Sequence, residues 1–367
     1  MTVSGPPRAP GTSDIQTGTS VYTSPLLDHP GAVAGSAPDA AVAAHYGDPF
    51  AEQRLLASGA GFVDLSHRDV LTISGPDRLS WLHGISTQHL ETLPAGASTT
   101  TLVLSPQGHV EYVLYLVDDG DRLWVSTEPG AGAGLGDFLR RMVFMLRVTI
   151  EDLSDELGVV WFPGAAPAAG ADGVARDESG SPIRQGSDSL GGYETFRPPT
   201  DMPALAASTR PAGMWALEAR RIAAGVPRVG LEADARAIPN ELGWIGPAVH
   251  LDKGCYRGQE TVARVHTLGR PPRRLVLLHL DGSADDLPAH GAAISAVEGN
   301  AADGREVGFV GSAVRHHELG PIALGVVKRN VPTDLTLLVA GQDGVVAAAQ
   351  EVVVQPDVGL HVRARLR

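Results

Sequence analysis

Residues 251–260 read LDKGCYRGQE and contain Cys255, the only cysteine of the chain. Two glycines flank it, Gly254 and Gly258, so the backbone here can turn sharply or approach a partner closely. A lysine and an arginine also flank it, and nearby positive charge favours the thiolate, which is the reactive form of cysteine. Because such cations are seldom buried unpaired, the stretch favours an exposed, functional thiol. A buried cysteine acting as a small apolar residue is the alternative.

Eight consecutive residues form a specific pattern around this thiol: Lys253, Gly254, Cys255, Tyr256, Arg257, Gly258, Gln259 and Glu260. The pattern resembles the K-G-C-Y-x-G-Q-E signature of the YgfZ family. These are folate-binding proteins related to the T-protein, the aminomethyltransferase of the glycine cleavage system. Residues 224–228 and 238–241 are similar to the family as well, and the likeness extends from about Asp48 to the C-terminus.

Two kinds of strand pattern divide the rest of the chain. From residue 48 to 162, apolar runs joined by turn sequences such as SPQG at 105–108 alternate with amphipathic stretches, which is typical of α+β structure with an antiparallel sheet. From residue 270 onward, short β-type runs separated by glycine-rich turns predict a small barrel or sandwich. The resemblance implies an aminomethyltransferase-like folate-binding region of two subdomains over residues 45–269 and a C-terminal β-barrel domain over residues 270–367.

Composition excludes several classes of protein. The 367 residues suffice for two or three domains, and no apolar run approaches the ~20 residues of a membrane span. The net charge of −13 argues against direct nucleic-acid binding and against an anionic membrane surface. One cysteine excludes an internal disulfide and suits a reducing, cytoplasmic location. Residues 1–44, rich in Pro, Gly, Ser, Thr and Ala, are expected to form a disordered tail without signal-peptide character.

The sequence gives little support for a metal site, a hydrolase or a phosphate-binding loop. Thirteen histidines are present, but adjacent strand residues such as His316 and His317 point to opposite faces, so no metal site is predicted. The chain has no G-x-S-x-G elbow and no phosphate-binding P-loop. A Cys–His hydrolase using His250 or His266 remains a minor alternative, because the sequence does not supply its geometry.

The resemblance implies a pocket for tetrahydrofolate or a derivative. A flat pteridine needs aromatic or apolar walls, and its glutamate tail favours a cation. The candidate contacts are Arg68, Tyr112, Trp215 and Arg221. For each of these residues the alternative is a purely structural role. In that reading the two aromatic residues pack in the core, and the two arginines lie on the surface.

One departure from the T-protein pattern bears on catalysis. The T-protein carries an acidic residue for aminomethyl transfer in a G-G-x-x-D-D-like stretch, and residues 108–114 here read GHVEYVL. Tyr112 or Val113 stands in the place of the aspartate. Glu111 is acidic, but an offset of one residue turns a strand side chain to the opposite face. The departure weighs against a classical aminomethyltransferase and leaves open whether the protein is an enzyme.

The resemblance implies a folate-binding accessory protein for the assembly or repair of iron–sulfur clusters. Its partners would be folate and iron–sulfur client enzymes or cluster-assembly proteins, including enzymes that modify tRNA, so that any effect on tRNA is indirect. Cys255 would be the working thiol. Two alternatives from other classes are a tetrahydrofolate-dependent aminomethyltransferase and a scaffold with a vestigial pocket.

Overall fold

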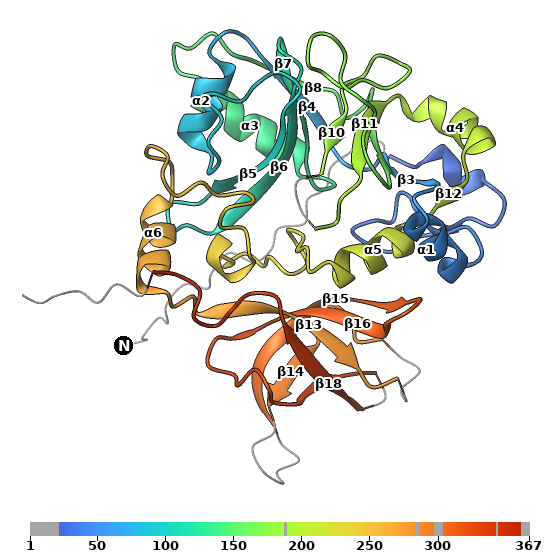
Figure 1. Cartoon of the computed structure of the whole chain (residues 1–367), viewed down its shortest axis with the longest axis vertical. Coiled ribbons are helices and arrows are strands. Elements are labelled where there is room, and N and C mark those ends of the chain that lie inside the picture. Colours follow the sequence, from blue (N-terminus) through green and yellow to red (C-terminus); the bar gives the residue numbers. More distant parts are fainter. Residues whose placement is uncertain (1–21, 187–188, 283–286, 297–303, 343, 361–367) are drawn as a thin grey trace, which may run out of the picture.

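Two five-stranded sheets, a closed barrel and a small two-stranded sheet, flanked by helices, make up the described part of the molecule. The computed structural model describes residues 22–186, 189–282, 287–296, 304–342 and 344–360. Two five-stranded sheets lie in the upper part of Figure 1, and a closed six-stranded barrel lies below them. The predicted class, α+β with antiparallel sheets and a C-terminal β-barrel, is confirmed.

The first sheet contains the hairpins expected from the turn sequences. Its order is β5 (Ser98–Leu104), β6 (Val110–Asp118), β7 (Arg122–Ser126), β4 (Val70–Ser74) and β8 (Thr149–Asp152), and every pair is antiparallel. The helices α2 (Arg78–Ile85) and α3 (Gly132–Met142) pack on one face. In β6, Leu114 and Leu116 face those helices, whereas Val113 enters the core shared with the barrel. Both faces of β6 are therefore covered, which explains its nearly continuous apolar sequence.

The second sheet is mixed. Its order is β10 (Arg184–Gln185), β11 (Tyr193–Arg197), β9 (Gly158–Phe162), β3 (Phe62–Leu65) and β12 (Pro211–Ala212), with β12 parallel to β3 and the other pairs antiparallel. Helices α1 (Pro49–Ala57), α4 (Met202–Ser208, after the 3₁₀ turn η2, Pro199–Asp201) and α5 (Met214–Ala223) accompany it. The carboxylate of Asp48 caps α1 by accepting the N–H groups of Phe50 and Ala51, as an N-cap aspartate should.

The barrel closes the C-terminal part of the chain. Its strands follow the order β13 (Arg273–Leu280), β16 (Gly320–Lys328), β15 (Arg305–His316), β14 (Ala293–Ala296), β17 (Leu337–Ala340) and β18 (Val345–Val352). α5 lies between this barrel and the sheets: Leu217 packs into the core of the second sheet, and Ile222 packs into the core that includes β13 and β16. Sites on α5 are therefore positioned by two domains at once.

The N-terminal segment differs from the expectation. Residues 22–44 are not a tail: they form the 3₁₀ turn η1 (Pro25–Asp28) and strand β1 (Val33–Ala34), which pairs with β2 (Ala43–His45). Leu26 and Val42 are fully buried. The prediction of a disordered segment through residue 44 is thus wrong for residues 22–44, because apolar residues such as Leu26 and Val42 are buried in the cores of the molecule. Residues 1–21 lie outside the described part of the chain.

The signature stretch leads into a helix. After the 3₁₀ turn η3 (Pro239–Glu241), a long loop reaches α6 (Gln259–Leu268), which begins within the signature itself. Among the described residues, no helix combines the length and the apolar character needed to cross a bilayer.

Candidate functional site

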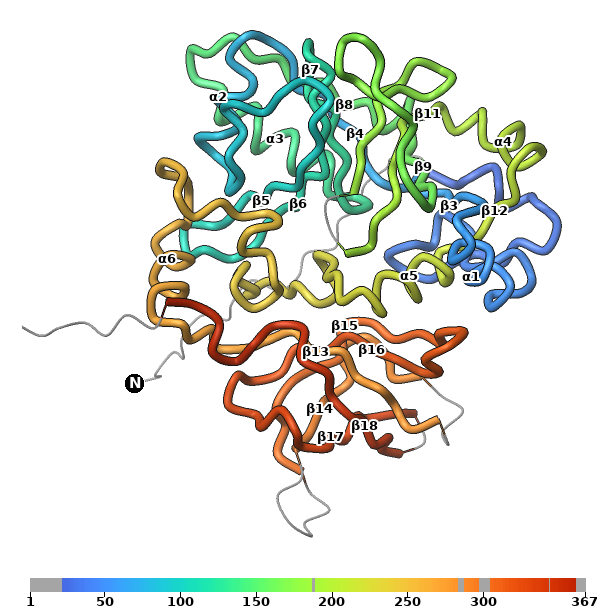
Figure 2. Tube along the Cα trace, in the orientation of Figure 1, coloured from blue at the N-terminus to red at the C-terminus, as the bar shows by residue number. Residues whose placement is uncertain are grey.

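Cys255 is exposed, as the sequence predicted. It lies in the loop before α6, and in Figure 2 this loop runs beside β5 and β6. The role of its thiol stays a prediction, but the anchoring of the loop around it is visible in detail.

Lys253 fixes the start of this loop to α2. Its Nζ donates hydrogen bonds to the carbonyl oxygens of His83 and, at 2.5 Å, of Ser86, at the C-terminal end of the helix. It also lies 5.1 Å from the centre of the Tyr256 ring. A cation at a helix C-terminus satisfies orphan carbonyls and interacts favourably with the helix dipole. Lys253 therefore has a structural role that its position beside the cysteine did not indicate.

The end of the loop is fixed by its second glycine and by the residues around it. Gly258 has φ +81° and caps α6, and a Cβ placed there would lie 2.4 Å from the carbonyl oxygen of Ser105. Gln259 Oε1 accepts the N–H of Tyr256 at 3.0 Å. Glu260 lies in the first turn of α6, where a negative charge is favourable. Arg257 Nη1 pairs with Glu111 Oε2 at 3.1 Å. Most of the signature thus holds the loop in place around the thiol.

We expect Lys253 to titrate well below an ordinary lysine. Burial lowers the pKa of its amine from 10.5 to about 8. Since the chain has only two lysines, the variant Lys328→Arg leaves Lys253 as the only one. NMR of this variant after ¹³C reductive methylation should show a side-chain resonance with a midpoint near pH 8. Because the unfolded chain binds more protons between pH 8 and 10.5, this group makes the free energy of unfolding rise with pH across that window. A midpoint near 10.5 would contradict the burial.

The four residues predicted to contact folate line three separate cavities. Trp215 lines one of about 440 Å³, and Tyr112 lines a groove of about 600 Å³ together with Arg257. Arg68 and Arg221 share a cavity of about 30 Å³. Ligand pockets measure roughly 300–1,000 Å³, so only the first two spaces match a folate-sized molecule. The structure brings the two arginines together and keeps the two aromatic residues apart.

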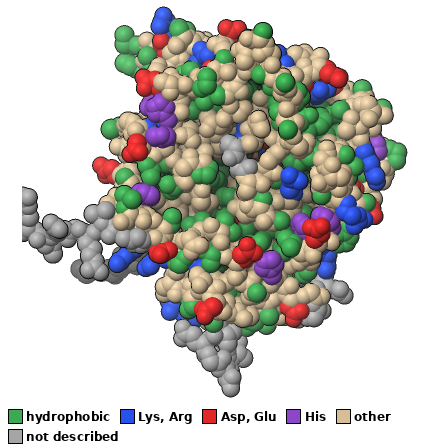
Figure 3. All heavy atoms as spheres, viewed as in Figure 1, with side chains coloured by type: hydrophobic (Ala, Val, Ile, Leu, Met, Phe, Trp, Pro, Cys, Tyr) green, Lys and Arg blue, Asp and Glu red, His purple; other side chains and the backbone are tan. Residues whose placement is uncertain are grey.

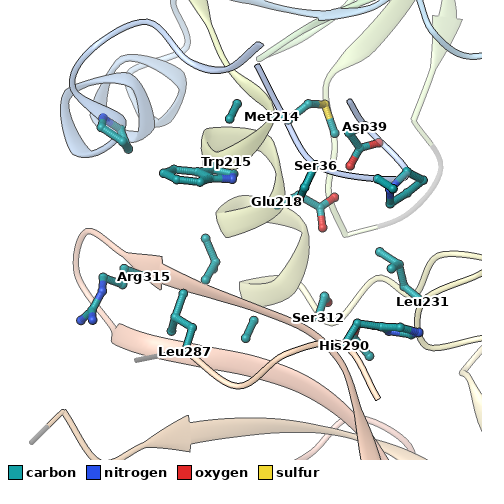
Figure 4. A pocket seen from close by; sticks show the side chains of 18 of the residues that line it. Ser36, Asp39, Met214, Trp215, Glu218, Leu231, Leu287, His290, Ser312 and Arg315 are labelled. Atoms are coloured by element: carbon teal, nitrogen blue, oxygen red, sulfur yellow. The ribbon is translucent and has the colours of Figure 1, made fainter. Parts of the chain in front are cut away.

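The cavity at Trp215 lies between α5, the N-terminal segment and β15 (Figure 4). The Trp215 side chain is 48% exposed, so it forms a wall of the cavity and is not the core residue of the alternative reading. Both apolar and polar side chains line the space. Its lining includes Ser36, Asp39, Phe50, Met214, Glu218, Leu231, Leu287, His290, Ser312 and Arg315.

The two arginines are buried in ion pairs, so the surface reading is wrong for both. Arg68 Nη1 lies 3.0 Å from Glu194 Oε1, and its guanidinium lies over the ring of Tyr115. Arg221 bonds to Glu218 at 2.7 Å and to Glu232 at 3.1 Å. Burial disfavours its charged form, but these carboxylates outweigh burial and raise the pKa of Arg221.

Arg228 is the central residue of this charge network, and the sequence did not single it out. Its guanidinium pairs with Asp39 and Glu128, both at 2.9 Å, and with Glu218 at 3.1 Å. Burial alone would raise the pKa of Asp39, but hydrogen bonds from His67 and Arg228 outweigh it and lower that pKa. Arg228 lies in the family-like stretch at residues 224–228, which was the available signal. The network separates the Trp215 cavity from the small cavity of Arg68 and Arg221.

The stretch compared with the acidic segment of the T-protein lies beside the 600 Å³ groove. Tyr112 and Glu111 both line the 600 Å³ groove, and Val113 is buried. Glu111 is engaged by Arg257 of the signature. The Glu111 carboxylate therefore helps to hold the loop around Cys255 in place through its ion pair with Arg257.

The histidines show a grouping that the sequence missed. Among the described residues, the side chains of His83, His89 and Glu91 bring one potential metal-ligating atom each within 4.8 Å of one another. Their spacing matches no known metal motif, and only the turn after α2 brings them together.

Comparisons with known proteins match this architecture. No protein-family model matches the chain. The chain is 27% identical over 310 residues to an aminomethyltransferase of Saccharopolyspora erythraea, covering 76% of this chain and 82% of that protein. It is 24% identical over 301 residues to the iron-sulfur cluster assembly factor IBA57 homolog, mitochondrial, of Pyricularia oryzae, covering 76% and 74%.

A solved structure extends the match to nearly the whole chain. The crystal structure of glycine cleavage system aminomethyltransferase T from Bartonella henselae superposes with a TM-score of 0.77 at 18% identity, covering 91% of this chain and 98% of that one. The chain therefore has the fold of the glycine cleavage aminomethyltransferase, and its relatives include both aminomethyltransferases and an iron–sulfur cluster assembly factor.

Proposed function

We propose that this protein is a folate-binding accessory factor for the assembly or repair of iron–sulfur clusters, with Cys255 as its working thiol. The observation that carries the proposal is an exposed cysteine on a loop fixed at both ends. Lys253 ties one end to α2, and Gly258 seats the other against the turn after β5. A thiol held in this way can meet a partner protein without a large ordering cost. The relative named as an iron–sulfur cluster assembly factor supports this role.

Tetrahydrofolate, or a derivative, is placed in the Trp215 cavity under this proposal. The indole offers a flat face for the pteridine, and the carboxylates of Asp39 and Glu218 face the same space. Carboxylates suit the amino edge of a pteridine, and Arg315 supplies a cation for the glutamate tail. Arg221 supports this wall from behind through Glu218 and Ser312. The partners are iron–sulfur client enzymes or cluster-assembly proteins in the cytoplasm.

Any support of tRNA modification would pass through such client enzymes. The chain carries a net charge of −13, and in Figure 3 the Lys and Arg side chains of the visible face are scattered among acidic ones. A protein that binds nucleic acid directly needs clustered cations. The proposed effect on tRNA is therefore indirect.

Three variants test the proposal. Trp215→Ala should weaken tetrahydrofolate binding in calorimetry by tenfold or more, because it removes the aromatic wall. Phe144→Ala, which removes an exposed aromatic side chain outside the cavity, should leave the affinity unchanged.

Cys255→Ser should bind folate normally but fail to restore the activity of iron–sulfur enzymes in a strain that lacks this factor. Full restoration by Cys255→Ser would contradict the role of the thiol.

The second candidate function is tetrahydrofolate-dependent aminomethyl transfer. It is favoured by the relatives named aminomethyltransferase. Two observations weigh against this function. The resemblance puts Tyr112 or Val113, neither of them acidic, where the T-protein carries its acid, and the nearby Glu111 is paired with Arg257. An assay with an aminomethyl-lipoyl carrier protein separates the two functions. Turnover by the wild-type protein would reject the accessory role in favour of the transferase.

A further inference from the structure

A cluster of histidines lies beside the end of α2, apart from the cavity at Trp215. His83 is in the last turn of α2, and His89 and Glu91 follow in the segment after it. Histidine side chains gather next to acidic ones at the left of the face in Figure 3, near α2. We infer that His83, His89 and Glu91 form a binding site for a divalent transition-metal ion of the zinc type.

The geometry is close to that of a metal site. The three potential ligand atoms all lie within 4.8 Å of one another, so an ion at their centre would be at most about 2.8 Å from each. Zinc bonds to histidine nitrogen and carboxylate oxygen measure roughly 2.0–2.2 Å. Each ligand atom therefore has to move by less than about 1 Å, which side-chain rotation alone supplies.

The backbone around the three ligands is held firmly. Leu90 N–H donates to His83 Nδ1 at 3.2 Å, and His89 N–H donates to the side chain of Gln88 at 2.9 Å. Gln88 donates in turn to the carbonyl oxygen of Pro247 at 3.2 Å. The ring of His250 lies 5.4 Å from that of His89. A preformed frame of this kind limits the ordering that metal binding would otherwise require.

The His83 ring can present either nitrogen to an ion. While Nδ1 accepts the Leu90 N–H at 3.2 Å, the ring proton is on Nε2, so coordination through Nε2 requires the other neutral tautomer, in which the proton moves to Nδ1 and the bond from Leu90 is lost. Coordination through Nδ1 instead replaces the bond from Leu90 and leaves the proton on Nε2. Neither route changes the number of protons on the ring.

The donor set defines the class of metal. Two imidazoles with one carboxylate suit zinc, cobalt, nickel or copper, whereas magnesium and calcium prefer oxygen ligands alone. Three protein ligands leave at least one position open for water or an incoming ligand. The thiol of Cys255 is not part of the group. The site therefore stands independently of the role proposed for that cysteine.

Calorimetric titration of the full chain, without an affinity tag, with ZnCl₂ at pH 7.5 tests the inference. We expect one zinc ion per chain. His89→Ala and Glu91→Gln should each weaken binding by at least tenfold. The matched control is His316→Gln, from a pair of histidine rings 4.7 Å apart elsewhere in the chain, and it should bind as the wild type does.

The absence of a stoichiometric zinc equivalent in the wild type would overturn the site, and so would unchanged affinity in both ligand variants. Glu91 is exposed, so we expect Glu91→Gln to fold as the wild type does. If His89→Ala proves unstable, the affinity of Glu91→Gln alone decides the test. Loss of binding in His316→Gln but not in Glu91→Gln would assign the ion to the other pair and reject the inference.

Discussion

The variant Gly258→Ala should lose on the order of 3 kcal/mol of its free energy of unfolding. Gly258 has φ +81°, a conformation that costs residues with a Cβ roughly 1–2 kcal/mol. The added Cβ would also lie 2.4 Å from the carbonyl oxygen of Ser105 and 2.9 Å from the Cα of Gly108. Both neighbours are backbone atoms, so no side-chain rotation relieves the clash. Urea unfolding followed by circular dichroism measures the loss.

The other glycine of the signature is the matched control. A Cβ on Gly254 meets no atom within 4 Å, and this residue is not among the glycines with positive φ. We therefore expect Gly254→Ala to change the free energy of unfolding by less than about 0.5 kcal/mol. Equal effects of the two substitutions would mean that the loop does not pack against the turn after β5. The sequence predicted a bend at both glycines, but the structure requires glycine only at the second.

Local signals in the sequence predicted most of the fold. The turn sequence at residues 105–108 joins β5 to β6 because Gly108 supplies the positive φ that the turn needs. Asp48 and Pro49 begin α1 as their capping chemistry requires. Gly225, at φ +68°, follows the end of α5. Each of these features depends on residues only a few positions apart, so sequence alone contains the needed information.

Features that depend on distant residues were not predictable. The ion pair between Asp39 and Arg228 joins positions 189 residues apart, and no local pattern marks the two residues as partners. The same contact helps to anchor residues 22–44, together with the burial of Leu26 and Val42. The predicted folate contacts failed to converge for a related reason: which cavity a side chain lines depends on how α5, β6 and the barrel pack together.

The variant Arg228→Met should lose about 3–5 kcal/mol of its free energy of unfolding at pH 7, the typical cost of breaking a buried ion pair. The Arg228 side chain is 3% exposed and pairs with Asp39, Glu128 and Glu218. Methionine fills much of the volume but leaves buried carboxylates without this cation. Because Asp39 is one of them, the segment of residues 22–45 should also become sensitive to proteolysis. Arg257→Met is the control: its pair with Glu111 is about one-third exposed on each side and should cost less than ~1 kcal/mol.

Acid should shrink the difference between Arg228→Met and the wild type. Burial raises the pKa values of Asp39 and Glu218, but their arginine and histidine partners outweigh burial and lower both below the ordinary 3.8 and 4.5. A carboxylate with a lowered pKa contributes stability that is present above its ordinary pKa and is lost as the pH falls. The wild type therefore loses this contribution in acid, whereas the variant has little of it to lose. Urea unfolding at pH 7 and pH 4 should show a smaller gap at pH 4, and a gap that is constant with pH would mean that Arg228 stabilises the fold by packing alone.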